Sequence, residues 1–166
     1  MPKIIENLPQ RLLEEARHQL TEMGCATLNI RTVAKNCGVG VGTVYNYYPS
    51  KDALIAEALL LDWRECLARI RAVATADCAI EPVMQAVYRE LTAFYRQYEN
   101  LFHAAQAEGV TPQKHYHIIL RGQISEVFQP FCPDKFTADF FAEAFLVWSV
   151  EGVPYSILRD LLLRVL

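Results

Sequence analysis

The sequence has no long hydrophobic run and no export signal. A membrane-spanning helix needs about 20 mostly apolar residues. The richest stretch, residues 140–150, is about half as long as that and contains Glu143. The N-terminus lacks the basic start and long apolar run of a secretory signal. We therefore predict a cytoplasmic protein without a membrane segment.

Metal-binding patterns are also missing. The 5 cysteines form no Cys-x-x-Cys pair and are odd in number, so they suggest neither a zinc site nor a disulfide framework. We expect most of them in the core as reduced thiols, with a redox switch at Cys78 or Cys132 as an alternative. His115 and His117 would point to different faces of a helix and would not easily bind one ion. We predict no metal and no cofactor.

The sequence shows no constellation typical of an enzyme. There is no evident nucleophile with a neighbouring base, paired carboxylates or phosphate-binding loop. Gly38, Gly40 and Gly42 are not preceded by the strand that a dinucleotide fingerprint requires. Strand signals and internal repeats are missing as well. With 52% hydrophobic and 21% charged residues, the chain is predicted to be an all-α globular protein that is not an enzyme.

Residues 29–51 predict two short helices joined by a tight turn. Asn29 is a good N-cap for the first helix, and Gly38 is suited to the left-handed conformation that ends a helix. Val39 lies between two glycines and can pack into the angle between the helices. The second helix, about 41–47, is poor in helix-forming residues and needs tertiary support. This arrangement is a helix-turn-helix.

The stretch also carries the pattern Gly-Val-x-x-Gly-Thr-x-Tyr-x-Tyr-Tyr-x-x-Lys over residues 38–51. In this pattern the chain resembles the N-terminal domain of the TetR family of transcriptional regulators, over roughly its first third. The resemblance implies a three-helix DNA-binding domain at 1–50 and a helical ligand-binding and dimerisation domain at 51–166, with about nine helices in all. It also implies a dimeric repressor that binds a palindromic operator and is released by a small hydrophobic effector.

The resemblance further implies which residues contact DNA. The expected set is Arg31, Val41, Gly42, Thr43, Tyr45, Asn46, Tyr47 and Lys51. The hydroxyl groups of this set and the Lys51 ammonium would bind phosphates along one edge of a helix in the major groove.

Base reading is expected from fewer groups. Arg31 is the best candidate, because a bidentate guanidinium–guanine contact is the commonest specific pairing. Thr43 and Asn46 are further candidates, and Val41 would make methyl contacts. Gly40 stands where the family commonly has serine, so we expect weak readout from the start of this helix.

The charge distribution limits how DNA could be bound. Residues 1–55 hold six Lys and Arg against five Asp and Glu, whereas residues 56–166 hold ten against fourteen. The N-terminal part is less acidic than the rest but is not a strongly basic patch. DNA affinity would therefore depend on a few positioned groups, doubled in a dimer.

Helical periodicity predicts the other elements. The expected helices run over about 9–23, 50–74, 99–108, 112–128, 137–151 and 154–166, and one more helix is expected to begin at residue 81. The first of these helices would brace the two short helices predicted within residues 29–51, which the resemblance assigns to DNA reading. The helix over 50–74 would continue from the DNA-binding part into the rest of the chain, so a displacement at its far end could change the spacing of two DNA-binding domains.

The last two expected helices are too apolar for the surface of a monomer. A helix that is apolar on all sides must be buried on all sides. We expect a homodimer in which these two helices and their symmetry mates form a four-helix bundle.

Aromatic residues at helical spacing in the C-terminal part predict either a packed core or an effector pocket. The candidates for effector binding are Tyr88, Tyr95, Phe102, His103, Tyr116 and Trp148. The family resemblance favours the pocket, since regulators of this type usually answer to a small hydrophobic effector. The alternative function is a helical small-molecule-binding or interaction module without specific DNA binding, which the retained motif residues disfavour.

Overall fold

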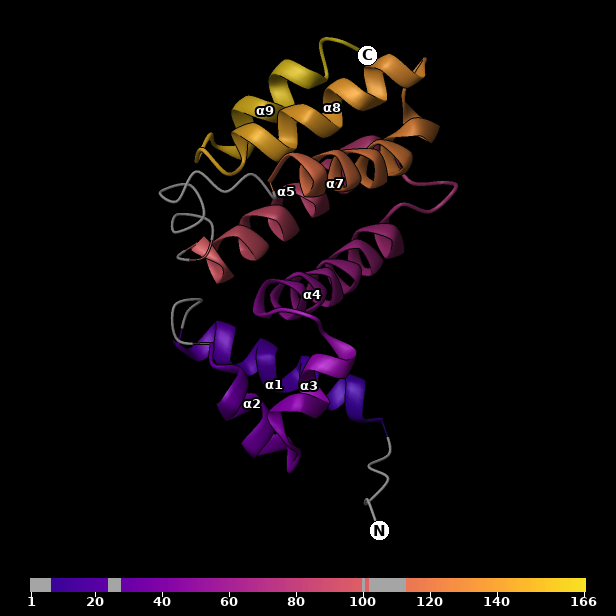
Figure 1. The fold of residues 1–166 in the computed structure, drawn as a ribbon. Coiled ribbons are helices and arrows are strands. Elements are labelled where there is room, and N and C mark those ends of the chain that lie inside the picture. The colour runs from indigo at the N-terminus through magenta and orange to yellow at the C-terminus, as the bar shows by residue number, and fades with distance from the viewer. Residues whose placement is uncertain (1–6, 24–27, 100, 102–112) are drawn as a thin grey trace. The chain divides into compact units, whose positions relative to one another are not determined.

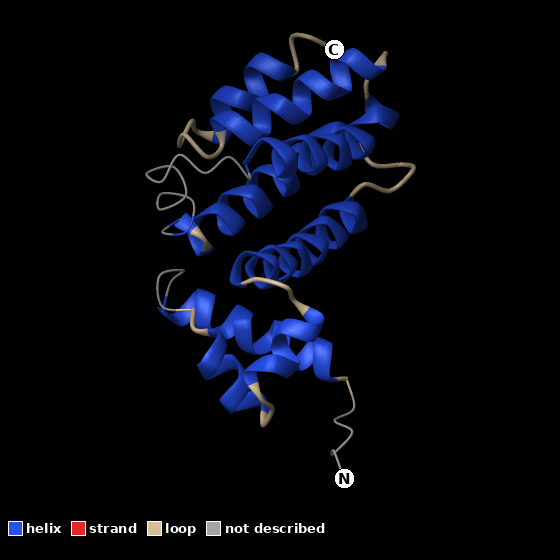
Figure 2. Ribbon diagram, in the orientation of Figure 1, coloured by secondary structure: helices blue, strands red, loops and turns tan. Residues whose placement is uncertain are grey.

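The computed structural model describes residues 7–23, 28–99, 101 and 113–166, with the backbone alone at 23 and 113–116. In these ranges the chain forms eight α-helices and one 3₁₀ turn and contains no strand (Figure 2). The all-α fold class is confirmed. The expected helix over 99–108 lies almost entirely outside the described residues.

The chain divides into two compact units. The described residues up to Trp63, together with Tyr98, Glu99 and Leu101, form the first unit, and residues 64–97 and 113–166 belong to the second. Helix α4 (Lys51–Val73) passes from one unit into the other (Figure 1). The expected domain boundary after residue 50 stays a prediction.

The first unit is built from three helices and the start of α4. They are α1 (Leu8–Met23), α2 (Ile30–Cys37) and α3 (Val41–Tyr47). Helix α1 packs on α2, and α2 packs on α3. The core of these three helices consists of apolar side chains at helical spacing, namely Leu12, Ala16, Leu20, Ile30, Val33, Ala34, Cys37 and Val44. The short helices α2 and α3 are therefore supported by tertiary packing, as expected.

The second unit contains the end of α4 and four further helices. These are α5 (Ile80–Gln97), α7 (Gln113–Phe128), α8 (Lys135–Trp148) and α9 (Tyr155–Leu162), with the 3₁₀ turn η2 (Gln129–Phe131) after α7. Helix α7 packs along α8, and α5 packs on α7, α8 and α9. The fully buried ring of Phe128 stacks on Phe145 and meets Phe141 edge-on, both at 5.5 Å between centroids.

The ends of α8 and α9 differ from the expected ones. Helix α8 begins two residues earlier, because Asp134 is its N-cap and accepts a 2.7 Å hydrogen bond from the Thr137 amide. It ends at Trp148, and the chain then turns at Gly152, whose φ is 80°. Helix α9 ends at Leu162, where a 3.0 Å hydrogen bond from the Val165 amide to the Leu162 carbonyl closes a tight turn.

None of the helices that the structure describes is both long enough and apolar enough to cross a membrane.

Candidate nucleic-acid interface

Both ends of α2 are fixed by local hydrogen bonds. The Asn29 side chain accepts a 2.8 Å bond from the Arg31 amide at the start of the helix. At the other end Gly38 has φ 73°, a left-handed conformation that glycine adopts without strain. The amides of Gly38 and Val39 donate to the last carbonyls of α2, at 3.1 and 2.9 Å. The turn between α2 and α3 therefore forms as the sequence predicts.

Helix α3 is held by one face. Val44 is fully buried and Tyr48, directly after the helix, is 8% exposed. The Tyr48 hydroxyl donates a 3.1 Å hydrogen bond to the Pro9 carbonyl at the start of α1. Burial, with a smaller contribution from the Glu57 charge, raises the pKa of Tyr48, so the phenol keeps its proton for this bond. These two contacts turn the opposite face of α3 outward.

The outward face of α3 carries most of the expected DNA contacts. Gly42, Tyr45 and Asn46 are exposed and lie on one side of the helix, and Tyr47 is exposed beside them. The two tyrosines are 47% and 48% exposed, although a large aromatic side chain in a folded domain is usually more buried. Val41 and Thr43 are half-buried at the edge of this face. The exposed hydroxyls are thus available to a phosphate backbone.

The remaining two expected contacts come from the neighbouring helices. Arg31 is exposed in the first turn of α2, and Lys51 is half-buried at the first residue of α4. Ser50 is the N-cap of α4, and its hydroxyl accepts a 3.0 Å bond from the Ala53 amide. The eight residues therefore belong to α2, α3 and the start of α4, all in the first unit. Their contact with DNA stays a prediction.

The glycines of α3 have open space around them. Gly40 is extended, with φ −76° and ψ 153°, and caps α3 without a side chain. A Cβ atom there would lie 4.0 Å from the Thr43 hydroxyl, and a Cβ at Gly42 would meet nothing within 4 Å. Packing inside the unit therefore does not require glycine at either position. The missing side chains leave the α3 backbone open to close approach by a partner.

A polar network between α1 and α2 was not expected from the sequence. Glu15 accepts hydrogen bonds from Asn36 at 2.8 Å and from Gln19 at 2.7 Å. The side-chain oxygen Oε1 of Gln19 accepts in turn from the backbone amide of Asn29 at 3.2 Å. Gln19 is only 4% exposed and lies next to Ala16 and Leu20 on the apolar side of α1. A polar residue at an apolar position was the signal that could have revealed this network.

Two carboxylates, Asp62 and Glu90, are likewise polar residues at apolar positions of their helices. Asp62 lies four residues from both Ala58 and Cys66 on the apolar stripe of α4, and it is 4% exposed. Glu90 interrupts the apolar side of α5 and is 6% exposed. Its partner is Arg69 of α4, whose Nε donates to Glu90 Oε2 at 2.8 Å. Ionised groups are rarely this buried unless they are paired.

The effector candidates are only partly described. Tyr88, Tyr95 and Trp148 are half-buried in the second unit. The Tyr88 hydroxyl donates to the Val153 carbonyl at 3.1 Å, and its ring lies 5.5 Å from that of Tyr155. Phe102 and His103 lie outside the described residues, and so does the side chain of Tyr116. The Tyr88 hydroxyl is therefore already hydrogen-bonded within the protein. The expected pocket stays a prediction.

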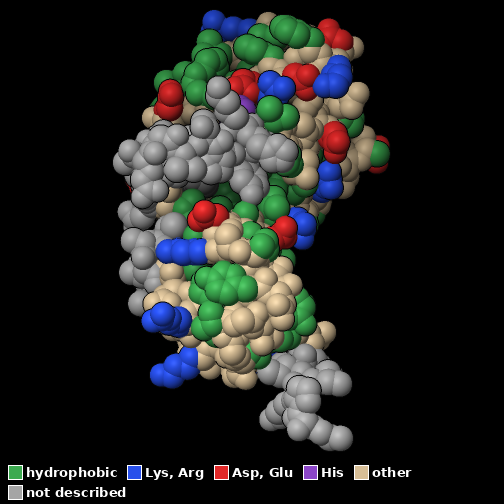
Figure 3. All heavy atoms as spheres, viewed as in Figure 1, with side chains coloured by type: hydrophobic (Ala, Val, Ile, Leu, Met, Phe, Trp, Pro, Cys, Tyr) green, Lys and Arg blue, Asp and Glu red, His purple; other side chains and the backbone are tan. Residues whose placement is uncertain are grey.

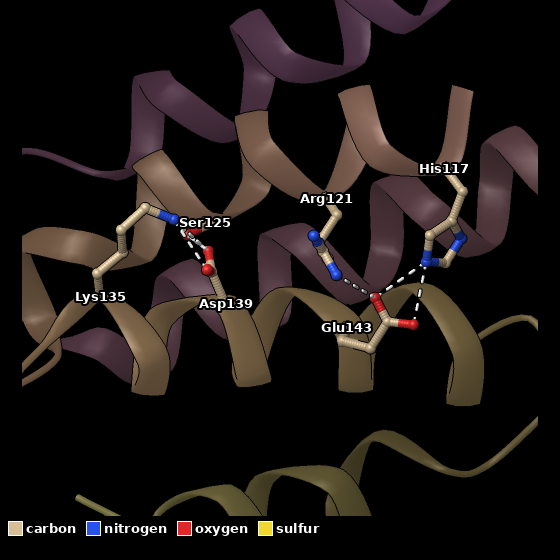
Figure 4. Close-up of polar contacts among 6 residues, drawn as sticks. All are labelled: His117, Arg121, Ser125, Lys135, Asp139 and Glu143. Carbon is tan, nitrogen blue, oxygen red and sulfur yellow. Dashed lines mark hydrogen bonds and ion pairs between the residues drawn. The ribbon is translucent and has the colours of Figure 1, made fainter. Parts of the chain in front are cut away.

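The polar side chains between α7 and α8 form two clusters (Figure 4). His117 and Arg121 of α7 point at Glu143 of α8, with 2.9 Å from His117 Nε2 and 3.8 Å from Arg121 Nη1 to Oε2. One turn earlier on α8, hydrogen bonds from Lys135 and then Ser125 hold the pKa of Asp139 below its usual value. His117 thus contacts a carboxylate. Within the described ranges no three His, Cys, Asp or Glu residues are grouped to hold a metal ion.

The cysteines among the described residues are thiols and not disulfides. Cys37 and Cys66 are buried, as expected, and Cys78 and Cys132 are half-buried. Burial raises the pKa of Cys132, and the nearby Asp134 charge raises it further. A higher pKa leaves less of the reactive thiolate at neutral pH, which disfavours the redox alternative at Cys132.

The N-terminal part of the chain matches known regulators in sequence. Residues 12–58 match the family described as bacterial regulatory proteins, tetR family. The chain is 36% identical over 61 residues to the HTH-type transcriptional regulator UidR of Escherichia coli, covering 37% of this chain and 31% of UidR. It is 37% identical over 57 residues to the regulator Rv1816 of Mycobacterium tuberculosis, covering 34% and 24%. The matched part spans less than a third of either regulator.

Solved structures resemble the chain over most of its length. A putative transcriptional regulator from Streptomyces coelicolor, SCO7518, has a TM-score of 0.68 at 16% identity and covers 95% of this chain and 96% of its own. FadR of Thermus thermophilus, a TetR-family repressor crystallised with lauroyl-CoA, has a TM-score of 0.63 at 18% identity, with coverage of 93% and 91%. At these identities the likeness shows the fold, which both units share with these proteins. The resemblance predicted from the sequence is confirmed.

Proposed function

We propose that this chain is a DNA-binding transcriptional repressor that responds to a small effector. Its residues 12–58 match the TetR family of bacterial regulatory proteins. The chain would bind a palindromic operator as a homodimer and leave the operator when the effector binds. Because its partner would be chromosomal DNA, the proposal also places the protein in the cytoplasm.

The outward face of α3 is the observation that carries this proposal. Val44 and Tyr48 anchor the helix from one side, so the exposed Tyr45, Asn46 and Tyr47 are presented on a rigid support. Hydroxyl, amide and cationic groups on one surface suit phosphate and base-edge contacts in a major groove. A helical corner that served packing alone would not need exposed tyrosines.

The exposed apolar side chains at the C-terminal end support a homodimer. Phe140 of α8 is 40% exposed, and Ile157 and Leu161 of α9, one turn apart, are 50% and 48% exposed. Figure 3 shows hydrophobic side chains, in green, at the surface of the region that ends in α9. A second copy that covered this face would remove the apolar area from water. A symmetric dimer would place two reading helices about 34 Å apart, in successive major grooves.

The second unit is the proposed place for the effector. Tyr88 and Tyr95 lie seven residues apart on the same side of α5, and both are half-buried. The structural relative FadR holds lauroyl-CoA, which supports a ligand with a long apolar part. Effector binding among α5, α7 and α8 would shift α4 and change the spacing of the two DNA-binding units. A coupling of about 1–3 kcal/mol would weaken operator binding about 5- to 150-fold.

DNA binding by the full chain is the first experiment. We would measure fluorescence anisotropy with the DNA upstream of its own gene, and with duplexes selected by the protein from a random library, at two salt concentrations. An unselected duplex is the control. The proposal predicts tight, salt-sensitive binding of a dimer to selected DNA. Equal binding to selected and unselected DNA would favour the small-molecule-binding or interaction module instead.

The effector response needs a second measurement. Lauroyl-CoA is a suitable first probe, added to the complex of protein and selected duplex. Release of DNA at probe concentrations that also raise the thermal midpoint of the free protein is the expected result. If a panel of acyl and aromatic probes raised the thermal midpoint without changing DNA affinity, ligand-controlled release would be wrong.

A further inference from the structure

Asp62 of α4 connects three separate parts of the chain inside the first unit. Its carboxylate forms an ion pair with Arg17 of α1 and accepts a hydrogen bond from the hydroxyl of Tyr98. Asp62 is 4% exposed and Tyr98 is 2% exposed. Along the chain, each of the three residues is at least 36 positions away from the other two, and this contact brings them together. We call Arg17, Asp62 and Tyr98 the carboxylate triad.

The triad lies next to the two places within the described residues where the chain passes between the two units. The first passage follows Trp63, one residue after Asp62. The second comes between Gln97 and Tyr98, so Tyr98 is the first residue of the first unit after α5. Along these described parts of the chain, a movement of α5 or of the second half of α4 therefore enters the first unit at a residue of the triad or its direct neighbour.

A second buried carboxylate fixes α4 in the other unit. Arg69 lies seven residues beyond Asp62, two helical turns along the same face of α4. Its guanidinium donates to Glu90 of α5 at 2.8 Å, and Arg89 donates to the other oxygen of Glu90 at 3.0 Å. Helix α4 is thus attached to α5 at Arg69 and to α1 and Tyr98 at Asp62. Both attachments lie on α4, so strain that arises at α5 can reach Asp62 along this helix.

From Arg17 the contacts continue to the reading helices. Glu15 and Gln19 lie two residues to either side of Arg17 on α1, and they bind opposite ends of α2 through Asn36 and Asn29. Asn29 is also the N-cap that holds the Arg31 amide. A displacement of α1 at Arg17 therefore acts on both ends of the helix that carries the expected base reader.

The triad can transmit a movement because separating a buried carboxylate from one of its partners costs free energy. Removing one partner of a buried ion pair leaves an uncompensated charge in a poorly solvated site. When Tyr98 moves, Asp62 must follow it or reorganise, and Arg17 must then adjust. The three side chains are therefore expected to move together, as a coupling element requires.

We propose that Asp62 couples the chain at Tyr98, directly after α5, to the DNA-binding helices, with Arg17 and Tyr98 as its positioning partners. The proposal rests on the proposed function, since it explains how the second unit would control α2 and α3. None of the three residues is required to touch DNA. They act by holding α1, and through α1 the two ends of α2.

Hydrogen exchange in the full chain tests the coupling without any DNA. Tyr98→Phe removes only the hydroxyl and keeps the buried ring, so the variant should fold. The matched control is Tyr155→Phe, which removes the hydroxyl that donates to the Glu81 carbonyl at 3.1 Å in the second unit. We expect Tyr98→Phe to speed exchange of α1 and α2 amides about 2- to 30-fold and the control to leave them unchanged. Unchanged exchange in both variants would overturn the proposal.

A double-mutant cycle separates coupling from simple loss of packing. Tyr98→Phe, Arg17→Gln and the double variant are compared for affinity to the selected duplex, at a temperature where all are folded. If both residues act through Asp62, the double variant will bind about as weakly as the weaker single variant. If the two losses add, Tyr98 and Arg17 act independently and the triad does not couple them.

The two measurements also separate this inference from the proposed function. If the unmodified chain shows no preference for any duplex, the proposed function fails, and the exchange comparison still decides whether Tyr98 holds α1 and α2. If the chain binds selected DNA but exchange does not respond to Tyr98→Phe, the regulator stands and the triad is not its coupling element.

Discussion

Helices α3 and α9 are similar in length and are attached in the same way, yet their outward faces differ. Helix α3 buries Val44 and exposes Tyr45 and Asn46. Helix α9 buries Leu158 and Leu162 and exposes Ile157 and Leu161. The exposed residues compared on α3 offer hydrogen-bonding groups, whereas Ile157 and Leu161 on α9 offer aliphatic carbon.

The difference indicates two kinds of partner. Polar and aromatic groups on α3 gain most against an anionic, hydrogen-bonding surface such as the DNA backbone. Aliphatic groups on α9 gain only by removal from water, which another apolar protein surface provides. Each face can be altered separately, because the buried side of each helix keeps it in place.

The largest effect is expected from a charge on the α9 face. Leu161→Asp would place a carboxylate in the proposed dimer interface, where it has no partner. We expect sedimentation to show monomers and affinity for the selected duplex to fall about 100-fold or more, since one unit would then bind alone. Ser156→Asp is the control, because it adds the same charge at an exposed polar position of α9. A Leu161→Asp variant that stayed dimeric would remove α9 from the interface.

The next largest effect is expected at the proposed base reader. Arg31→Ala should cost about 1–3 kcal/mol of binding free energy on the selected duplex and much less on an unselected one. Competition anisotropy with the two duplexes gives the difference directly. An equal loss on both duplexes would make Arg31 a phosphate contact. Because Arg31 is exposed, the free energy of unfolding should change little.

Lys51 should behave in the opposite manner to Arg31. Lys51→Ala removes one proposed phosphate contact, so it should weaken binding to all duplexes alike. The slope of log affinity against log salt concentration should fall in magnitude by about one. A titration at four salt concentrations measures this slope. If the loss depended on the DNA sequence, the assignment of Lys51 to the phosphate backbone would be wrong.

The smallest effects are expected at Gly42, where stability and binding should change in opposite directions. Gly42→Ala places a methyl group in open space on α3 and should raise the free energy of unfolding by about 0.5–1 kcal/mol, because alanine loses less conformational entropy. DNA affinity should fall if the α3 backbone approaches the duplex closely. Thermal unfolding and anisotropy on the same preparation give both quantities. A more stable variant with unchanged affinity would place Gly42 outside the interface.

The elements set by local chemistry were predicted closely. The ends of α2 depend on a capping asparagine and a left-handed glycine, and both act within a few residues of sequence. Helices α3 and α4 likewise begin where expected, at Val41 and next to the N-cap Ser50. The ends of α8 and α9 were predicted less accurately. There the choice between continuing a helix and tightening a turn depends on small energy differences that periodicity does not show.

The candidate DNA surface could be listed from the sequence, but its orientation could not. The motif supplied the residue types, whereas the outward direction of Tyr45 and Tyr47 follows from the burial of Val44 and the Tyr48 contact to Pro9. The effector candidates were chosen from aromatic spacing alone, and the structure gives the Tyr88 hydroxyl a partner within the fold. Spacing along one helix does not reveal which other helix faces it.

The sequence by itself therefore determined the helical class, the helix-turn-helix and the family resemblance, because capping, turn chemistry and hydrophobic spacing are local properties. Only the tertiary structure decided that Asp62 meets Arg17 and Tyr98, and that Gln19 meets Asn29. These pairs are distant in the chain, and each is formed because a buried polar group must find a partner wherever the packing of helices provides one.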